Sequence, residues 1–230
     1  MIKKEKSSSL KILLILTLFI VLFLSFANSS DTSLLGYNSL GEVVKHDYSH
    51  YGDADTKIAI ISGMHSRENL HAVILPEICK FISLFNKVEI VNYQVTVTKN
   101  PGNFEEGRVN GESLVNEFVV KDIGKNDFDL VIIGHDHEEG YGEGYYIATP
   151  SMDEKSINLA NKVVDNIGFN YYKRDTSSVV KSSSINTVDN PIVNTNTPLF
   201  VYEIPENDFI LFAFINSYRL INESINILNN

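Results

Sequence analysis

Three of the six histidines in the chain follow directly on apolar runs. His65 and Glu68 come after the run 57–62, and His135 and His137 come after a later one. A histidine and a glutamate three residues apart share a face at the start of a helix, so both can reach one ion. The same spacing occurs in surface pairs, but its coincidence with several strand ends favours a metal. A nitrogen from His135 or His137 would complete three protein ligands and leave a position for water, as in a catalytic zinc site.

Glu203 lies within the apolar run Leu199–Ile204. A carboxylate in a buried strand is costly unless it is paired or functional. It could act as a general base that takes a proton from water and passes it to a leaving amine. Alternation along the strand could instead direct Glu203 to solvent. A module that only binds its ligand has no evident use for such an acid beside a metal.

Alternating strands and helices must position these side chains. Apolar runs and alternation predict four strands, at residues 57–62, 89–98, 129–133 and 199–204. Helical spacing predicts three helices, over residues 69–85, 152–167 and from 205 to about 228. Pro76 must kink the first helix or begin a second one. The order predicts an α/β fold with a mainly parallel or mixed central sheet flanked by helices. Ligands in such folds bind at the carboxyl ends of the strands.

Three other segments read as irregular. Ser30–Asp55 is polar and rich in turn residues, and Thr176–Asn196 is rich in Ser, Thr and Asn and predicts a long loop. The loops Glu138–Gly144 and Thr176–Asn196 are candidate walls of a pocket.

The N-terminal residues have the pattern of an export signal. Basic residues precede the apolar stretch 12–26, and a small-x-small triplet follows it at 27–29. We predict a signal peptide or membrane anchor over 1–29 and one catalytic domain over 30–230. An uncleaved anchor through 12–27 stays open, although the stretch is short for a bilayer span, which needs about 17–25 residues. Either alternative predicts an extracytoplasmic body, secreted or held at the outer face of the membrane.

The composition limits which classes of molecule the protein is expected to bind. The formal charge of −10 predicts that the protein does not bind nucleic acid, because an acidic body repels phosphate backbones. The one cysteine, Cys79, cannot form an internal disulfide and is expected to pack as a small hydrophobe.

Four motifs together resemble a known family. The stretch Gly63–Glu68 resembles the zinc-binding turn of zinc carboxypeptidases and of the succinylglutamate desuccinylase/aspartoacylase group. The run that ends on His135 is similar to the strand that carries this family's third zinc ligand. Residues 107–118 resemble the stretch with its substrate-polarising arginine, and 199–204 resemble the strand with its catalytic glutamate. The order of the motifs also matches, and the resemblance covers about residues 57–205.

The resemblance implies roles for individual residues. His65, Glu68 and His135 would hold zinc, Arg108 would stabilise the oxyanion, and Glu203 would be the base. From the residues alone, Arg108 reads as an exposed cation in a glycine-rich loop. The implied activity is hydrolysis of an amide or peptide bond. For an exported enzyme, a peptide or cell-wall peptide is the expected substrate.

Two departures from the family pattern bear on these roles. The family has an acid two residues before the third zinc ligand, and Ile133 stands there in this chain. His137 is therefore an alternative metal ligand, and Asp136 could instead orient the ligands. The family also has an Asn-Arg pair that grips a substrate carboxylate, and Val115 and Asn116 replace it. Asn116 remains the candidate substrate-binding residue, but a neutral amide cannot reproduce the bidentate grip of a guanidinium.

Two other functions compete with the hydrolase. Gly134–His137 resembles the strand end of calcineurin-like metallophosphoesterases, in which both histidines serve a two-metal site. The aspartates which that family places earlier are missing here. The second alternative is a catalytically degenerate module that binds peptide at the cell surface. The lost carboxylate grip favours this alternative, and the retained Glu203 opposes it.

Overall fold

The computed structural model describes residues 29–49, 54–173 and 183–230. The predicted signal or anchor at 1–29 lies outside these ranges except for Ser29. Within the described ranges, no helix combines the length and the apolar character that a membrane crossing requires.

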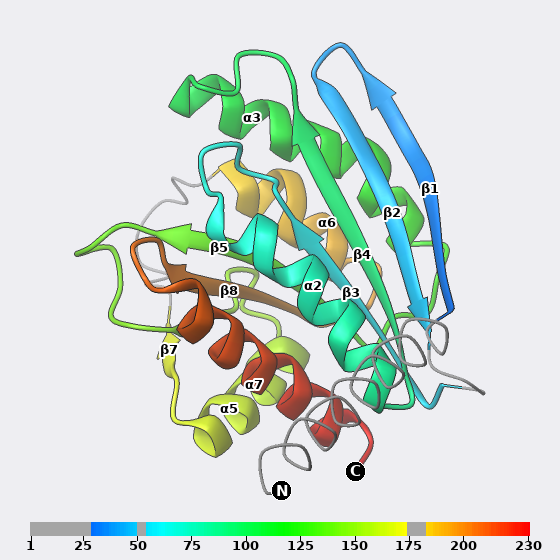
Figure 1. The fold of residues 1–230 in the computed structure, drawn as a ribbon, viewed down its shortest axis with the longest axis vertical. Helices are drawn as coiled ribbons and strands as arrows, with labels where there is room; N and C mark the ends of the chain where they lie inside the picture. The colour runs from blue at the N-terminus through cyan, green and yellow to red at the C-terminus, as the bar shows by residue number, and fades with distance from the viewer. Residues whose placement is uncertain (1–28, 50–53, 174–182) are drawn as a thin grey trace, which may run out of the picture.

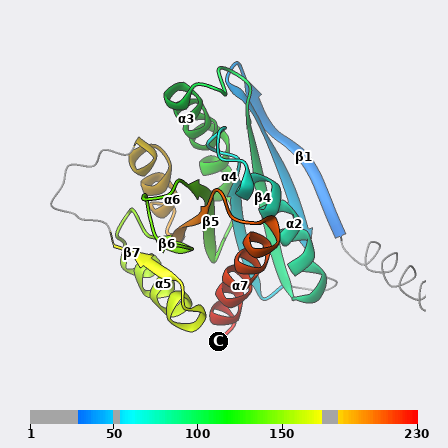
Figure 2. The same cartoon turned by 60° about the vertical axis from the view of Figure 1, so that its left-hand side comes forward.

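The centre of the fold is a sheet of eight strands in the described part, in the order β1-β2-β4-β3-β5-β8-β6-β7 (Figure 1). The strands are β1 (Ser29–Asn38), β2 (Gly41–Ser49), β3 (Thr56–Ser62), β4 (Val88–Val97), β5 (Leu130–His137), β6 (Tyr146–Ala148), β7 (Asn170–Tyr172) and β8 (Leu199–Pro205). The four neighbours β4, β3, β5 and β8 run parallel. The hairpin β1–β2 joins β4 antiparallel at one edge, and β6 joins β8 antiparallel on the other side, so the sheet is mixed (Figure 2).

Both faces of the parallel strands are buried, because successive side chains point to opposite faces. In β3, Ile58 and Ile60 belong to one hydrophobic core, whereas Ala59 and Ile61 belong to the other. The first core is covered by α2 (Leu70–Phe85), α5 (Glu154–Ile167) and α7 (Ile210–Leu228), on the near side in Figure 1. The second core is covered by α3 (Phe104–Leu114), the π-helical turn η1 (Val115–Val119), α4 (Val120–Ile123), the π-helical turn η2 (Ile185–Asp189) and α6 (Asn190–Val193).

Most predicted elements are confirmed. The four predicted strands are β3, β4, β5 and β8, and the three predicted helices are α2, α5 and α7. Strand β5 extends four residues beyond its predicted end, to His137. Helix α2 is one continuous helix with Pro76 inside it, so Pro76 does not begin a second helix. Cys79 is fully buried in the first core, as expected of a small hydrophobe.

The prediction that Ser30–Asp55 is irregular is wrong over most of this segment. Strands β1 and β2 form an antiparallel hairpin there, and β2 pairs along its length with β4. The burial of β2 explains the error: only Gly41 and Val43 are buried, and the rest of the strand is partly or fully exposed. A half-exposed strand of this kind carries no apolar run that sequence periodicity could detect.

Two loop predictions are also wrong. The stretch around Arg108 is helix α3, whose start is capped by the side chain of Asn103. Of the loop predicted at 176–196, residues 176–182 lie outside the description, and 185–193 form η2 and α6. Helix α3 contains two glycines and few apolar residues, and η2 and α6 are short, so packing over the second core stabilises them. The short strands β6 and β7 were not predicted.

Candidate functional site

The candidate site lies where three neighbouring parallel strands end. In the pairing of β5 with β8, His135 lies directly opposite Glu203. Strand β3 precedes the loop that carries His65 and Glu68, and this loop turns at Gly63 with φ 76°. A Cβ at Gly63 would stand 2.5 Å from the Val95 carbonyl oxygen, so only glycine fits this turn. The turn returns the chain over β5.

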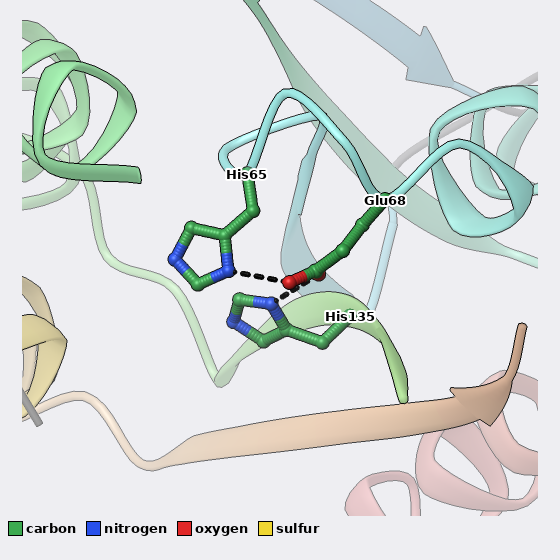
Figure 3. A group of neighbouring side chains, drawn as sticks. All are labelled: His65, Glu68 and His135. Carbon is green, nitrogen blue, oxygen red and sulfur yellow. Dashed lines mark hydrogen bonds and ion pairs between the residues drawn. The ribbon is translucent and has the colours of Figure 1, made fainter. Parts of the chain in front are cut away.

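His65, Glu68 and His135 converge on one point (Figure 3). The Nδ1 atom of His65 lies 2.7 Å from one carboxylate oxygen of Glu68, and the Nδ1 atom of His135 lies 2.7 Å from the other. One ligand atom from each residue lies within 4.8 Å of the other two. Two imidazole nitrogens and one carboxylate form a donor set that suits zinc. The three residues therefore offer a donor set that fits one metal ion.

The electrostatics of the cluster favour a cation. Burial alone would raise the pKa of Glu68, but His135 and His65 together hold it well below its usual range. Burial would lower the pKa of His65, and the carboxylates of Glu112 and Glu68 outweigh it and raise that pKa. Glu68 is thus an ionised carboxylate between two imidazoles.

Asp136 braces the ligand loop against β5. Its carboxylate accepts hydrogen bonds from the backbone N–H groups of Leu70 (2.6 Å) and His71 (2.9 Å), at the first turn of α2. The side chain of Asp136 thereby caps a helix that has no acidic residue in its first turn and no side-chain cap of its own. The Nε2 atom of His71 accepts from the N–H of Gly63 at 3.0 Å. Hydrogen bonds therefore fix both ends of the loop that carries His65 and Glu68.

A cavity of about 560 Å³ opens over the cluster and is lined by its three residues. Glu203 and Arg108 line the same cavity, as do Arg67, Tyr141, Tyr146 and Asp189. Burial raises the pKa of Glu203, and His135 opposes this shift. A raised pKa suits a carboxylate that must accept a proton and release it again.

Arg108 reaches the cavity from α3, and its Nε atom donates to Glu112 one helical turn later, at 3.1 Å. Its side chain is about a third exposed. The structure thus brings five of the predicted site residues together: His65, Glu68, His135, Arg108 and Glu203.

The other two predicted residues lie elsewhere. Asn116 is exposed on η1, does not line the cavity, and donates from its side chain to the Thr187 carbonyl at 2.5 Å. That placement does not bring it to a substrate in this cavity. His137 lines the cavity but is not part of the metal-type cluster. Its Nδ1 and Nε2 atoms face the carbonyl oxygens of Glu138 (3.2 Å) and Gly144 (2.8 Å), so backbone groups engage both ring nitrogens.

Sequence reasoning missed two buried acids at the site. Glu112 lies beside His65 and Arg108, and Asp189 lines the cavity from η2. Burial raises the pKa of Asp189 to about 7. The cap at Asn103 with Glu106 three residues on could have revealed α3, and hence the i, i+4 pair Arg108–Glu112. No comparable signal marks Asp189.

No protein-family model matches the sequence, and no curated protein matches it. Solved structures do match. A protein from Burkholderia mallei with a provisional carboxypeptidase assignment superimposes with a TM-score of 0.62 and 12% identity, over 86% of this chain and 64% of its own. A metallo-carboxypeptidase from Pseudomonas aeruginosa, in complex with (2-guanidinoethylmercapto)succinic acid, gives 0.57 and 14%, over 86% and 63%.

This chain has a metallo-carboxypeptidase-like fold. A third match is the cell shape determinant Csd4 from Helicobacter pylori, a D,L-carboxypeptidase in its mDAP-bound form, with a TM-score of 0.50 and 12% identity, over 76% of this chain and 51% of that one. The chain spans less than two thirds of the length of these three structures. At these identities the likeness concerns the fold alone.

Proposed function

We propose that the protein is a zinc-dependent amide or peptide hydrolase of the carboxypeptidase-like class. One observation carries the proposal: two imidazole nitrogens and a carboxylate converge at a cavity in which Glu203 lies in register with His135. The order of these residues along the chain is the order of the family that the sequence resembles. The carboxypeptidase-like fold supports the same class.

The roles of the residues follow from their positions. A zinc ion held by His65, Glu68 and His135 would supply Lewis acidity and lower the pKa of water. Glu203 accepts a proton from the attacking water and later donates it to the leaving amine. Arg108 lines the same cavity, and its positive charge stabilises the negative charge that develops on the substrate carbonyl oxygen.

The substrate we propose is a peptide, and a cell-wall peptide in particular. The D,L-carboxypeptidase neighbour with bound mDAP supports a substrate of that kind. Six acids line the cavity against two arginines; the acids are Glu68, Asp136, Glu138, Asp189, Glu203 and Glu206. Since Val115 and Asn116 do not supply a carboxylate grip, this lining favours substrates that present a neutral or cationic group. Asn116 has no part in the proposal.

The two competing functions, a phosphoesterase and a binding module, explain the arrangement of the site residues less well. A two-metal phosphoesterase needs His137 as a ligand together with His135, but both nitrogens of His137 face backbone carbonyls. A module that only binds peptide leaves unexplained why Glu203 stands at the cavity beside the metal-type cluster.

We also propose that the protein is exported, from its basic and apolar N-terminal residues alone. The body would then be secreted, or held at the outer membrane face through 12–27. Expression in a host that performs secretion, followed by N-terminal sequencing of the extracytoplasmic protein, tests this. A chain retained in the cytoplasm with Met1 intact would refute export.

The hydrolase is tested by metal content and turnover together. We expect one zinc per chain and cleavage of at least one substrate in a panel of N-acylated peptides and wall-peptide fragments. Glu203→Gln should lower kcat by about 10²–10⁴-fold, the usual contribution of general acid–base catalysis, while zinc content stays at one. Near wild-type kinetics in this variant would remove Glu203 from the mechanism. Absence of metal would favour the binding module, and two metals that require both His135 and His137 would favour the phosphoesterase.

A further inference from the structure

Glu112 is a buried carboxylate that connects two parts of the proposed site. It is 1% exposed. Its Oε1 atom accepts hydrogen bonds from Arg108 Nε at 3.1 Å and from Ser183 Oγ at 2.9 Å, and it lies 3.6 Å from His65 Nε2. One oxygen therefore faces both a proposed metal ligand and the cavity arginine.

Two glycines bring this carboxylate to the ligand loop. Gly107 and Gly111 lie one helical turn apart on α3, each directly before one of the two charged residues. A Cβ at Gly111 would stand 1.7 Å from the Met64 carbonyl oxygen, and a Cβ at Gly107 would stand 2.5 Å from Ser66 Oγ. Side chains at either position would push α3 away from the loop. The glycines thus let the helix backbone contact the residues on both sides of His65.

The second ring nitrogen of His65, Nε2, needs a hydrogen-bond partner. His65 Nδ1 points to Glu68 and the metal position, so Nε2 is the nitrogen on the far side of the ring. Nε2 is buried and has no hydrogen bond within the described residues. Glu112 Oε1 is the carboxylate oxygen that approaches it. A histidine that binds a metal through one nitrogen usually donates the N–H of the other to such an outer partner, which fixes the orientation of the ring.

We propose that Glu112 is a positioning residue that orients His65 toward the metal and at the same time holds Arg108 at the cavity. The inference rests on the zinc site of the proposed function. It adds a residue to which the family resemblance assigns no role, and it makes zinc affinity depend on a side chain of α3. Because one oxygen serves both partners, the helix that delivers the arginine also stabilises the metal loop.

Zinc affinity tests this directly. The dissociation constant is measured by competition with a chelator on the full chain, for wild type, Glu112→Ala and Glu112→Gln. Loss of an outer partner typically weakens metal binding by about 10–100-fold, which we expect for Glu112→Ala. Glutamine keeps an acceptor oxygen in the same volume, so Glu112→Gln should recover most of the affinity. Glu105→Gln, an exposed position on the same helix, is the matched control and should bind zinc like wild type.

Two further readouts separate positioning from general damage. Thermal unfolding of the metal-free proteins reports whether each variant folds. If Glu112→Ala does not fold, Glu112→Met takes its place, because methionine fills a similar volume without an acceptor oxygen of its own. The visible absorption of the cobalt-substituted protein reports ligand geometry, and we expect a band shift in Glu112→Ala and none in Glu105→Gln. If wild type binds no zinc, the proposed function fails and the inference with it. If wild type binds zinc and folded Glu112→Ala, or Glu112→Met in its place, binds it equally well, the inference alone is overturned.

Discussion

Two sides of the cavity are built in different ways. On one side, His65, Glu68, His135 and Glu203 stand at or just beyond the ends of the parallel strands β3, β5 and β8. On the other side, Arg108 and Glu112 project from α3, and Asp189 projects from η2, two elements outside the sheet. The sheet register positions the first group, whereas close packing of helices positions the second. Site residues at the strand ends can therefore be predicted from the sequence. Those on the side formed by α3 and η2, which we call the helical wall, cannot.

The largest expected effect is on zinc binding, and it distinguishes His135 from His137, both on β5. His135→Ala removes one of the three converging ligands, so zinc binding should be lost, well beyond the 10–100-fold cost of losing an outer partner. His137→Ala removes a ring that faces two backbone carbonyls, so zinc stoichiometry should stay at one. Mass spectrometry of the metal content of both variants decides this. Zinc that persists in the first and disappears in the second would reverse the assignment.

The next effect probes the buried acid of the helical wall. The pKa of Asp189 is about 7 in the folded state, raised by burial from 3.8. Between these pH values the unfolded chain releases the proton and the folded protein keeps it, so stability falls as pH rises from about 4 to 7. The loss is on the order of 4 kcal/mol at most, at 1.36 kcal/mol per pH unit. Asp189→Asn should remove this slope.

The measurement is urea unfolding of metal-free wild type and Asp189→Asn at pH 5 and pH 8. The variant should gain stability relative to wild type at pH 8 and gain less at pH 5. A difference between the two proteins that does not change with pH would mean that Asp189 ionises in the folded state as it does in water.

A smaller effect is expected where α3 contacts the ligand loop. Gly111→Ala places a methyl group against the Met64 carbonyl, and overpacking of this kind costs about 1–3 kcal/mol, which exceeds the gain of about 1 kcal/mol in helix propensity. The melting temperature should therefore fall. Gly102→Ala is the control, because a Cβ there has no atom within 4 Å. Equal melting temperatures for the two variants would show that α3 does not pack closely on the loop.

The smallest effect concerns Asn116. Its side chain is exposed and its hydrogen bond goes to Thr187, away from the cavity. Asn116→Ala should leave kcat/KM within about a factor of two, as expected for a surface substitution worth about 0.5 kcal/mol. A large rise in KM would return Asn116 to the substrate site and weaken the contrast between the two sides.

The sequence by itself determined the strand-end side. The apolar runs of β3, β5 and β8 are buried on both faces, and such runs are visible without any structure. Once these strands are parallel, their carboxyl ends must meet, which brings the polar residues after each strand together. His65, Glu68, His135 and Glu203 could therefore be grouped in advance, although the choice between His135 and His137 could not be made.

Only the tertiary structure decided the helical wall. Arg108 appeared to lie in a loop because the glycines around it read as turn residues, whereas in the fold Gly107 and Gly111 allow a helix to contact the ligand loop. Glu112 and Asp189 gain their character from burial, which removes water from a carboxylate that the sequence presents as an ordinary surface acid. Strand register follows from local periodicity, but the burial of a single charged side chain depends on which distant segments pack over it.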